Sequence, residues 1–246
     1  ISIFISGKRP SGSSDPYALR RNLNGVIKII WDYELDLPLE KLFNELIDFW
    51  KIEFPNLDFS KKEVLNDLIE FLVQRIVSHL EEISLSKELI KALYSSDEFS
   101  QKRILNIVDL KNRVKSIVNF KEKETFFEIQ KVITRVSKLA NSSNLSTEVL
   151  SIGDYVNTKL FEKDCELKVF EFIKELEKLY SKGSCDYLKL LNLFEININT
   201  IEDLFDNEKG VLVMTEDMKV RNNRLNLLSL IRNYSLKIAD FTLLNS

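Results

Sequence analysis

The side chains best suited to chemistry are a set of positive charges in the middle of the chain. Lys131, Arg135 and Lys138 are spaced at i, i+4 and i+7, which places all three on one face of a helix. They belong to residues 101–138, where ten Lys or Arg residues stand against four acids, a local charge of +6. A local positive field can bind phosphate even on a chain whose net charge is −3, so this stripe is a candidate phosphate-binding face.

Charge alone favours a plainer interpretation, in which these side chains are the solvated faces of two helices. The candidate set also includes Lys111 and Lys115 as flanking contacts from the preceding helix, and Arg221 from the last helix. Arg221 and Arg232 together form the alternative face. RNA loops are usually read by bases that stack on aromatic side chains or on arginine. Arg135 can serve in this way, but the sequence does not reveal which aromatic residues are exposed.

The rest of the sequence offers no arrangement typical of a catalytic or metal site. It has no phosphate-binding glycine loop, no two-cysteine metal knuckle and no Cys–His pair at a recognisable spacing. The one histidine, His79, lies among apolar residues, which favours packing over metal binding. Asp217, Arg221 and Arg224 share a stripe of the last helix, where we expect an ion pair across one turn and Arg224 clamping a neighbouring helix. We therefore expect no catalytic residue and no metal site.

Composition predicts the class of element that positions these side chains. The chain has 246 residues, enough for one large or two small domains with real cores. Only 6 Gly and 4 Pro leave too few turn residues for an all-β fold, so the predicted class is all-α. Two cysteines without metal spacing indicate a reduced, intracellular chain. Neither a membrane-spanning apolar run nor a signal peptide is visible, and because the chain does not begin with Met we expect a fragment of a longer protein.

Apolar residues recur at three- and four-residue steps along most of the chain, as in helices with one buried face. The first long helix is expected to begin with Asp15 as N-cap and Pro16 at the first helical position. Ser86, Ser184 and Thr215 are expected to cap three later helices. The remaining predicted helices are at 38–51, 61–82, 86–95, 100–121, 124–140, 163–180, 185–195, 200–206 and 216–243.

Two motifs at opposite ends of the chain carry a resemblance to a known family. The first is Gly7-x-x-Pro10-Ser11-Gly12-Ser13-x-Asp15-Pro16-Tyr17-Ala18-Leu19-Arg20-Arg21. The second combines Val213-Met214-Thr215-Glu216-Asp217, Arg221-x-x-Arg224-Leu225-x-Leu227-Leu228 and Ala239-Asp240-Phe241-x-Leu243. Together they resemble the bacterial-type glycyl-tRNA synthetase β subunit, with Ser11 and Tyr17 where that family has Thr and Phe. Weaker matches lie between them in the expected order.

The resemblance implies a division of the chain and a role for each part. Residues 1–97 would be the C-terminal part of a helical region related to the HD phosphohydrolase fold, and residues 98–246 a DALR-like anticodon-binding helical bundle. The two lobes would meet near Ser95-Ser96-Asp97. The implied function is recognition of tRNA(Gly) through its anticodon region during ATP-dependent glycylation, with Lys111, Lys115, Lys131, Arg135, Lys138 and Arg221 as the tRNA-binding residues.

For the whole enzyme, the resemblance implies a cytoplasmic α2β2 glycine–tRNA ligase whose α subunit holds the site for glycine and for ATP with magnesium. This chain would hold no cofactor, would not aminoacylate alone, and would have tRNA(Gly) and the α subunit as partners. Two other interpretations stay open. A helical protein–protein interaction module without an RNA ligand fits the composition equally well. The anticodon domain of an arginyl-type synthetase explains the last helix but not the loop that contains Pro10, Gly12 and Ser13.

Overall fold

The computed structural model describes residues 1–10, 15–94, 103–180 and 186–244, and every regular element among them is helical. The prediction of an all-α chain is therefore confirmed for this part of the sequence. Contacts group the chain into two compact units, Ile1–Asn112 and Arg113–Ser246. The junction expected at Ser95–Asp97 lies outside the described residues. No helix in the described ranges is both long and apolar enough to cross a membrane.

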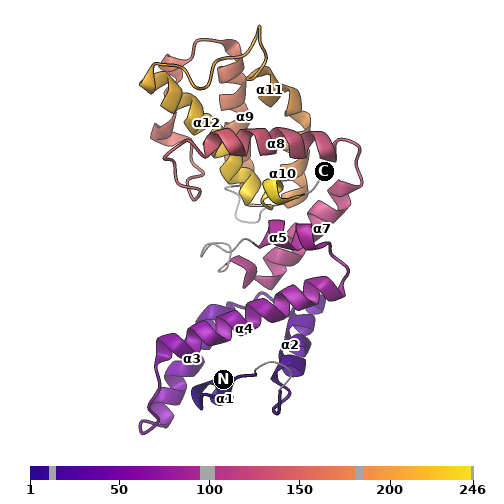
Figure 1. Ribbon diagram of the computed structural model, residues 1–246, viewed down its shortest axis with the longest axis vertical. Helices are drawn as coiled ribbons and strands as arrows, with labels where there is room; N and C mark the ends of the chain where they lie inside the picture. The colour runs from indigo at the N-terminus through magenta and orange to yellow at the C-terminus, as the bar shows by residue number, and fades with distance from the viewer. Residues whose placement is uncertain (11–14, 95–102, 181–185, 245–246) are drawn as a thin grey trace. The chain divides into compact units, whose positions relative to one another are not determined.

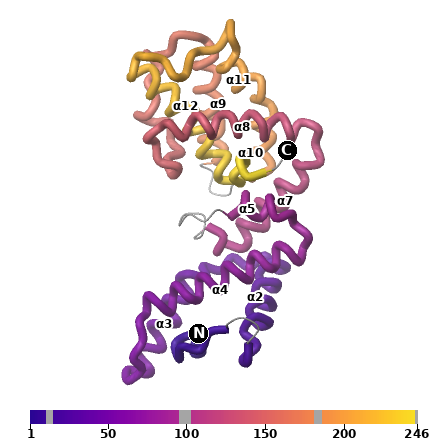
Figure 2. Tube along the Cα trace, viewed as in Figure 1, coloured from indigo at the N-terminus to yellow at the C-terminus, as the bar shows by residue number. Residues whose placement is uncertain are grey.

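In the first unit, the other helices pack around α4. The elements are α1 (Ser2–Ile5), α2 (Leu19–Tyr33), α3 (Leu39–Glu53), α4 (Lys61–Glu82) and α5 (Lys87–Leu93), followed by the start of α7 (Ile107–Lys121). Helix α4 contacts α1, α2, α3 and α5, and the trace in Figure 2 follows these helices in chain order. Ser60 and Ser86 accept backbone N–H groups three residues on, at 3.4 and 3.2 Å, and so cap α4 and α5. The predicted role of Ser86 is confirmed.

The predicted start of α2 is wrong by one turn. The Asp15 carboxylate accepts hydrogen bonds from the backbone N–H groups of Leu19 (2.8 Å) and Arg20 (2.9 Å). Ala18, which lies between Asp15 and Leu19 in the chain, adopts a left-handed conformation with φ of 53°. Asp15 therefore caps the helix from across a turn, and Pro16 precedes the helix instead of opening it. The neighbouring motif residues 11–14 lie outside the described part of the chain.

The first unit also exposes large apolar side chains on two outer faces. On α2 these are Val26, Ile29 and Tyr33, and on α3 they include Phe49 and Ile52. The spacing of the α2 residues, three and then four, places them on one stripe of the helix. Contiguous exposed apolar stripes often mark surfaces that contact another protein segment, a membrane or a ligand.

The second unit is built around α12 (Met218–Leu236), which packs along α8 (Phe126–Ala140) and α9 (Asp164–Tyr180) (Figure 1). The other elements are α10 (Tyr187–Ile196), α11 (Ile198–Asp203) and the short 3₁₀ helices η1 (Gly153–Tyr155), η2 (Thr158–Leu160) and η3 (Phe241–Leu243). Nearly every residue of α12 after Arg221 is buried. The sequence predicted that only one face of this helix would be buried. The structure buries α12 on nearly all sides, because it is the central helix of this unit.

Both ends of α12 differ from the prediction. The N-cap is Asp217, whose Oδ1 accepts from the N–H groups of Lys219 (2.8 Å) and Val220 (3.1 Å), and not Thr215. The pKa of the Asp217 carboxyl is lowered by these backbone hydrogen bonds. The helix ends at Leu236 instead of Leu243, and Asp240, which accepts from Thr242 N–H at 3.0 Å, caps the separate helix η3. The expected cap Ser184 lies outside the described residues; Asp186 caps α10.

Buried polar groups of α12 hold the segment between α8 and η1. The Arg232 guanidinium donates to the carbonyls of Ala140 (3.1 Å) and Leu145 (3.2 Å). The Asn233 amide donates to the Val149 carbonyl at 2.7 Å. Arg232 is thus buried and used within the fold, which removes it from the alternative RNA-binding face.

Candidate nucleic-acid interface

Helix α8 presents one buried and one charged face. Residues 126–140 contain no Gly or Pro, and Phe126, Ile129, Ile133 and Val136 are buried at helical spacing. The opposite side carries Lys131, Arg135 and Lys138, all exposed. The sequence predicted these three charges on one stripe, and the structure brings them together on one surface.

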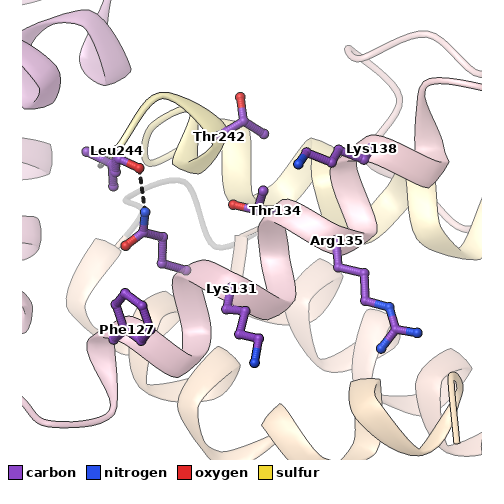
Figure 3. A pocket seen from close by; sticks show the side chains of 8 residues that line it. Phe127, Lys131, Thr134, Arg135, Lys138, Thr242 and Leu244 are labelled. Atoms are coloured by element: carbon purple, nitrogen blue, oxygen red, sulfur yellow. Dashed lines mark hydrogen bonds between the residues drawn. The ribbon is translucent and has the colours of Figure 1, made fainter. Parts of the chain in front are cut away.

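The three cations line one groove of the second unit (Figure 3). The groove has a volume of about 440 Å³. In the close view, Lys138 extends toward Thr242, whereas Lys131 and Arg135 extend away from η3. The complete lining consists of Phe127, Gln130, Lys131, Thr134, Arg135, Lys138, Thr242 and Leu244. A concave surface with three cations and a few neutral polar groups is suited to a phosphate-bearing ligand.

Phe127 is the one aromatic residue among the five groove residues that were not predicted from the sequence. Its side chain is 53% exposed, in contrast to the buried Phe126 beside it. Phe127 stands four residues before Lys131, so it continues the same stripe of α8 by one turn. Helical spacing in the sequence places Phe126 on the inward face and so leaves Phe127 outside, but no sequence signal assigned Phe127 to a groove.

Arg135 is fixed above an aromatic ring. Its guanidinium carbon lies 4.2 Å from the centroid of the Phe205 ring, a cation–π contact. Arg135 and Phe205 also line a second depression that includes Leu212 and Met214. Asp206 adjoins this region, but its carboxylate accepts the N–H groups of Glu208 and Lys209, which lower its pKa.

The other predicted RNA-binding residues have different surroundings. Lys115 is exposed on α7, within the second unit. Lys111 belongs to the first unit, where its ammonium group donates to the Trp31 carbonyl (2.7 Å) and pairs with Glu34 (2.8 Å). Arg221 is half-buried and its guanidinium contacts the sulfur of Met218. Only Lys131, Arg135 and Lys138 of the predicted set line the groove of Figure 3.

Within the stripe of Asp217, Arg221 and Arg224, Asp217 and Arg224 have structural roles, as expected for Arg224. The guanidinium of Arg224 donates to Glu166 at 2.9 Å and to Glu162 at 2.6 Å. Glu166 is the third residue of α9, so Arg224 clamps α12 to a neighbouring helix. The expected ion pair between Asp217 and Arg221, both of which the structure describes, is not formed; Asp217 instead caps α12.

The packing role predicted for His79 is confirmed. Its ring is buried on α4 and meets the Trp31 ring edge-on, with centroids 5.0 Å apart. Burial lowers its pKa below the ordinary value. Among residues 1–10, 15–94, 103–180 and 186–244, no group of three or more His, Cys, Asp and Glu side chains is arranged to hold a metal ion.

Fold and groove define an all-helical protein with a cationic surface on the second unit. Known proteins resemble this chain along almost its whole length. The profile described as "Glycyl-tRNA synthetase beta subunit" matches residues 1–95. A glycine–tRNA ligase beta subunit of Picosynechococcus sp. is 34% identical over 98% of this chain and 34% of its own length, and one of Yersinia pestis is 29% identical over 98% and 33%. Residues 1–95 thus match the glycyl-tRNA synthetase beta subunit family, and almost the whole chain is similar to such beta subunits while it spans about a third of the length of these curated relatives.

Proposed function

We propose that this chain is the tRNA-binding part of a glycine–tRNA ligase beta subunit and contacts the anticodon region of tRNA(Gly). The whole protein would act in the cytoplasm with an α subunit, as an α2β2 enzyme, to join glycine to tRNA(Gly). The relatives that match along almost the whole chain carry the name of that ligase subunit. ATP, with magnesium, and glycine are used at the α subunit in this proposal, and no catalytic step is assigned to residues of this chain.

The proposal assigns residues 1–97 to the end of a larger HD-like helical region and residues 98–246 to the anticodon-binding bundle. Support for the first assignment comes from the apolar stripes of α2 and α3, which include Ile29 and Phe49. Such stripes fit a region that packs against further chain. The relatives are about three times as long as this chain, because it covers 34% of them.

The observation that carries the RNA assignment is the groove on α8. Lys131, Arg135 and Lys138 are exposed, lie on one face and line one concave surface. Lys and Arg side chains are common partners of phosphate oxygens, and bound RNA would replace its counterions with these three charges. Arg135 lies over Phe205 at 4.2 Å, so part of the ordering of its side chain is already achieved before a ligand binds.

The test is a titration of the 246-residue chain with the glycine anticodon stem-loop at several salt concentrations. A Lys131→Ala/Arg135→Ala/Lys138→Ala variant is expected to bind more weakly. Its slope of log K against log salt should be smaller by up to about 2 units, since each contact with single-stranded phosphate contributes about 0.7. Circular dichroism checks that the variant is folded.

A matched control separates local contacts from net charge. Lys168, Lys174 and Lys178 are exposed on α9 of the same unit, and their triple alanine variant changes the net charge by the same amount. We expect it to retain the salt slope of the unmutated chain. Equal losses in both triple variants, or no loss in the α8 variant, would contradict a binding face on α8. Failure of the unmutated chain to bind at low salt would favour an interaction module without an RNA ligand.

A further inference from the structure

We propose that the groove on α8 holds one unpaired nucleotide of the bound RNA, with its base stacked on Phe127. This inference rests on the proposed RNA binding and names the part of the RNA that enters the groove. It assigns separate roles to an aromatic ring, to neutral polar groups and to two cations, which together match the parts of a nucleotide.

The aromatic wall is Phe127. The ring is 53% exposed and lines the groove from the first turn of α8, four residues before Lys131 (Figure 3). An unpaired base has an apolar face that stacks on such a ring whatever the base identity. Because the ring lies on the same stripe as the cations, a stacked base would have its phosphate within the positive field of Lys131.

Neutral polar groups line the groove beyond the ring. Gln130 is only 6% exposed, and its amide nitrogen donates to the Leu244 carbonyl at 2.5 Å. Within the described part of the chain, this leaves the amide oxygen of Gln130 as an acceptor for a ligand. The hydroxyl of Thr134 donates weakly to the Phe241 carbonyl at 3.4 Å and can still accept. Base edges carry N–H groups that pair with such acceptors.

The size and charge of the groove suit a single nucleotide. Its volume of about 440 Å³ falls in the range of small-molecule sites, about 300–1,000 Å³. Lys138 extends toward Thr242, and Lys131 lies two turns earlier on α8 (Figure 3). Two cations at this separation can contact the phosphates on either side of one splayed nucleotide, whereas an RNA duplex is recognised across a much wider surface.

The test compares Phe127→Leu, Phe127→Trp and Tyr155→Leu in the 246-residue chain, titrated with the glycine anticodon stem-loop. Tyr155 is a matched control, because it is 45% exposed in the same unit and is not a lining residue of the groove. Phe127→Leu should weaken binding by roughly 5- to 100-fold, the usual effect of losing one stacked base. The salt slope should stay unchanged, since stacking releases no counterions. Phe127→Trp and Tyr155→Leu should bind like the unmutated chain.

A second readout uses stem-loops in which one loop base at a time is replaced by fluorescent 2-aminopurine. We expect quenching at one position on binding, and loss of that quenching in Phe127→Leu. If the unmutated chain binds and the α8 triple alanine variant does not, but Phe127→Leu binds normally with normal quenching, the nucleotide site is overturned and the RNA proposal stands. If the unmutated chain does not bind the stem-loop, both proposals are overturned.

Discussion

Arg224 of α12 and Glu166 of α9 form an ion pair that is almost completely removed from solvent. Nε of Arg224 lies 2.9 Å from Oε1 of Glu166, and the two side chains are 2% and 0% exposed. The other carboxylate oxygen of Glu166 accepts the backbone N–H groups of Glu162 (2.7 Å) and Lys163 (3.1 Å) at the start of α9. One carboxylate therefore both caps α9 and anchors the central helix of the second unit.

Removal of Arg224 should destabilise the second unit. In Arg224→Met, the Glu166 carboxylate stays buried without its cation, a change that typically costs about 3–5 kcal/mol. We expect the lower end, because the backbone N–H groups still stabilise the carboxylate. Urea-induced unfolding measures the loss. Glu162→Gln is the control: the Glu162 side chain is 63% exposed, so breaking its pair should cost at most about 1 kcal/mol. Equal losses in the two variants would contradict the clamp.

Gly210 should not tolerate a side chain. A Cβ at this position would lie 2.4 Å from the Asp206 carbonyl oxygen and 2.6 Å from the Leu204 carbonyl oxygen, so backbone would have to move. Gly210→Ala is expected to cost about 1–3 kcal/mol, as overpacking does. Gly25→Ala is the matched variant: nothing lies within 4 Å of its Cβ, and in helix α2 alanine should stabilise by about 0.5–1 kcal/mol. Thermal unfolding should show opposite shifts, and a shift of the same sign would contradict this account.

His79 should make stability depend on pH. Burial against Trp31 lowers the pKa of His79 below the ordinary 6.5. The negative charges of Glu82 and Asp32 raise this pKa by less than burial lowers it, and the positive charge of Lys28 lowers it further. The unfolded chain then binds a proton at a higher pH than the folded chain. The contribution of neutral His79 to the free energy of unfolding is therefore fully present above pH 6.5. This contribution is lost as the pH falls below 6.5.

Because His79 is the one histidine of the chain, a single variant isolates this effect. His79→Gln cannot gain a proton, so its melting temperature should fall less than that of the unmutated chain between about pH 6.5 and 5. Carboxyl groups titrate mainly below this window and are common to both proteins. Parallel melting curves across the window would show that His79 is not the group responsible.

Sequence patterns predicted the helices better than their ends. The 3.6-residue period located α4 at 61–82 and α8 near 124–140 because each has one continuous apolar face. The position of each helix end depended on which of several nearby polar residues caps the free backbone N–H groups. Asp217, and not the expected Thr215, is the N-cap of α12, and the expected single helix is divided into α12 and η3, with Asp240 as the N-cap of η3. The backbone conformation before each helix determines which polar side chain reaches the free N–H groups. Residue types near the helix start do not reveal that conformation.

The groove was predictable in its charges but not in its aromatic wall. Lys131, Arg135 and Lys138 repeat at helical spacing, and long cations remain outside unless paired. Helical spacing places Phe126 inward, but the role of Phe127 in the groove depends on Thr242 and Leu244, which lie far later in the chain. Arg232 shows the converse: a long cation was expected at the surface, but its burial depends on carbonyls of residues 140 and 145, about ninety positions earlier, and sequence spacing cannot reveal that partnership.

The measurement that tests the central proposal most directly is the relative affinity of the 246-residue chain for two RNA hairpins of equal length and charge. One is the glycine anticodon stem-loop, and the other has the same stem closed by a loop of scrambled sequence. At fixed salt, phosphate contacts are equal for both, so any difference reports contacts to the loop bases. We expect the glycine loop to bind about tenfold more tightly or better, as about 1.4 kcal/mol of base contact provides. Equal affinities would contradict anticodon recognition by this chain.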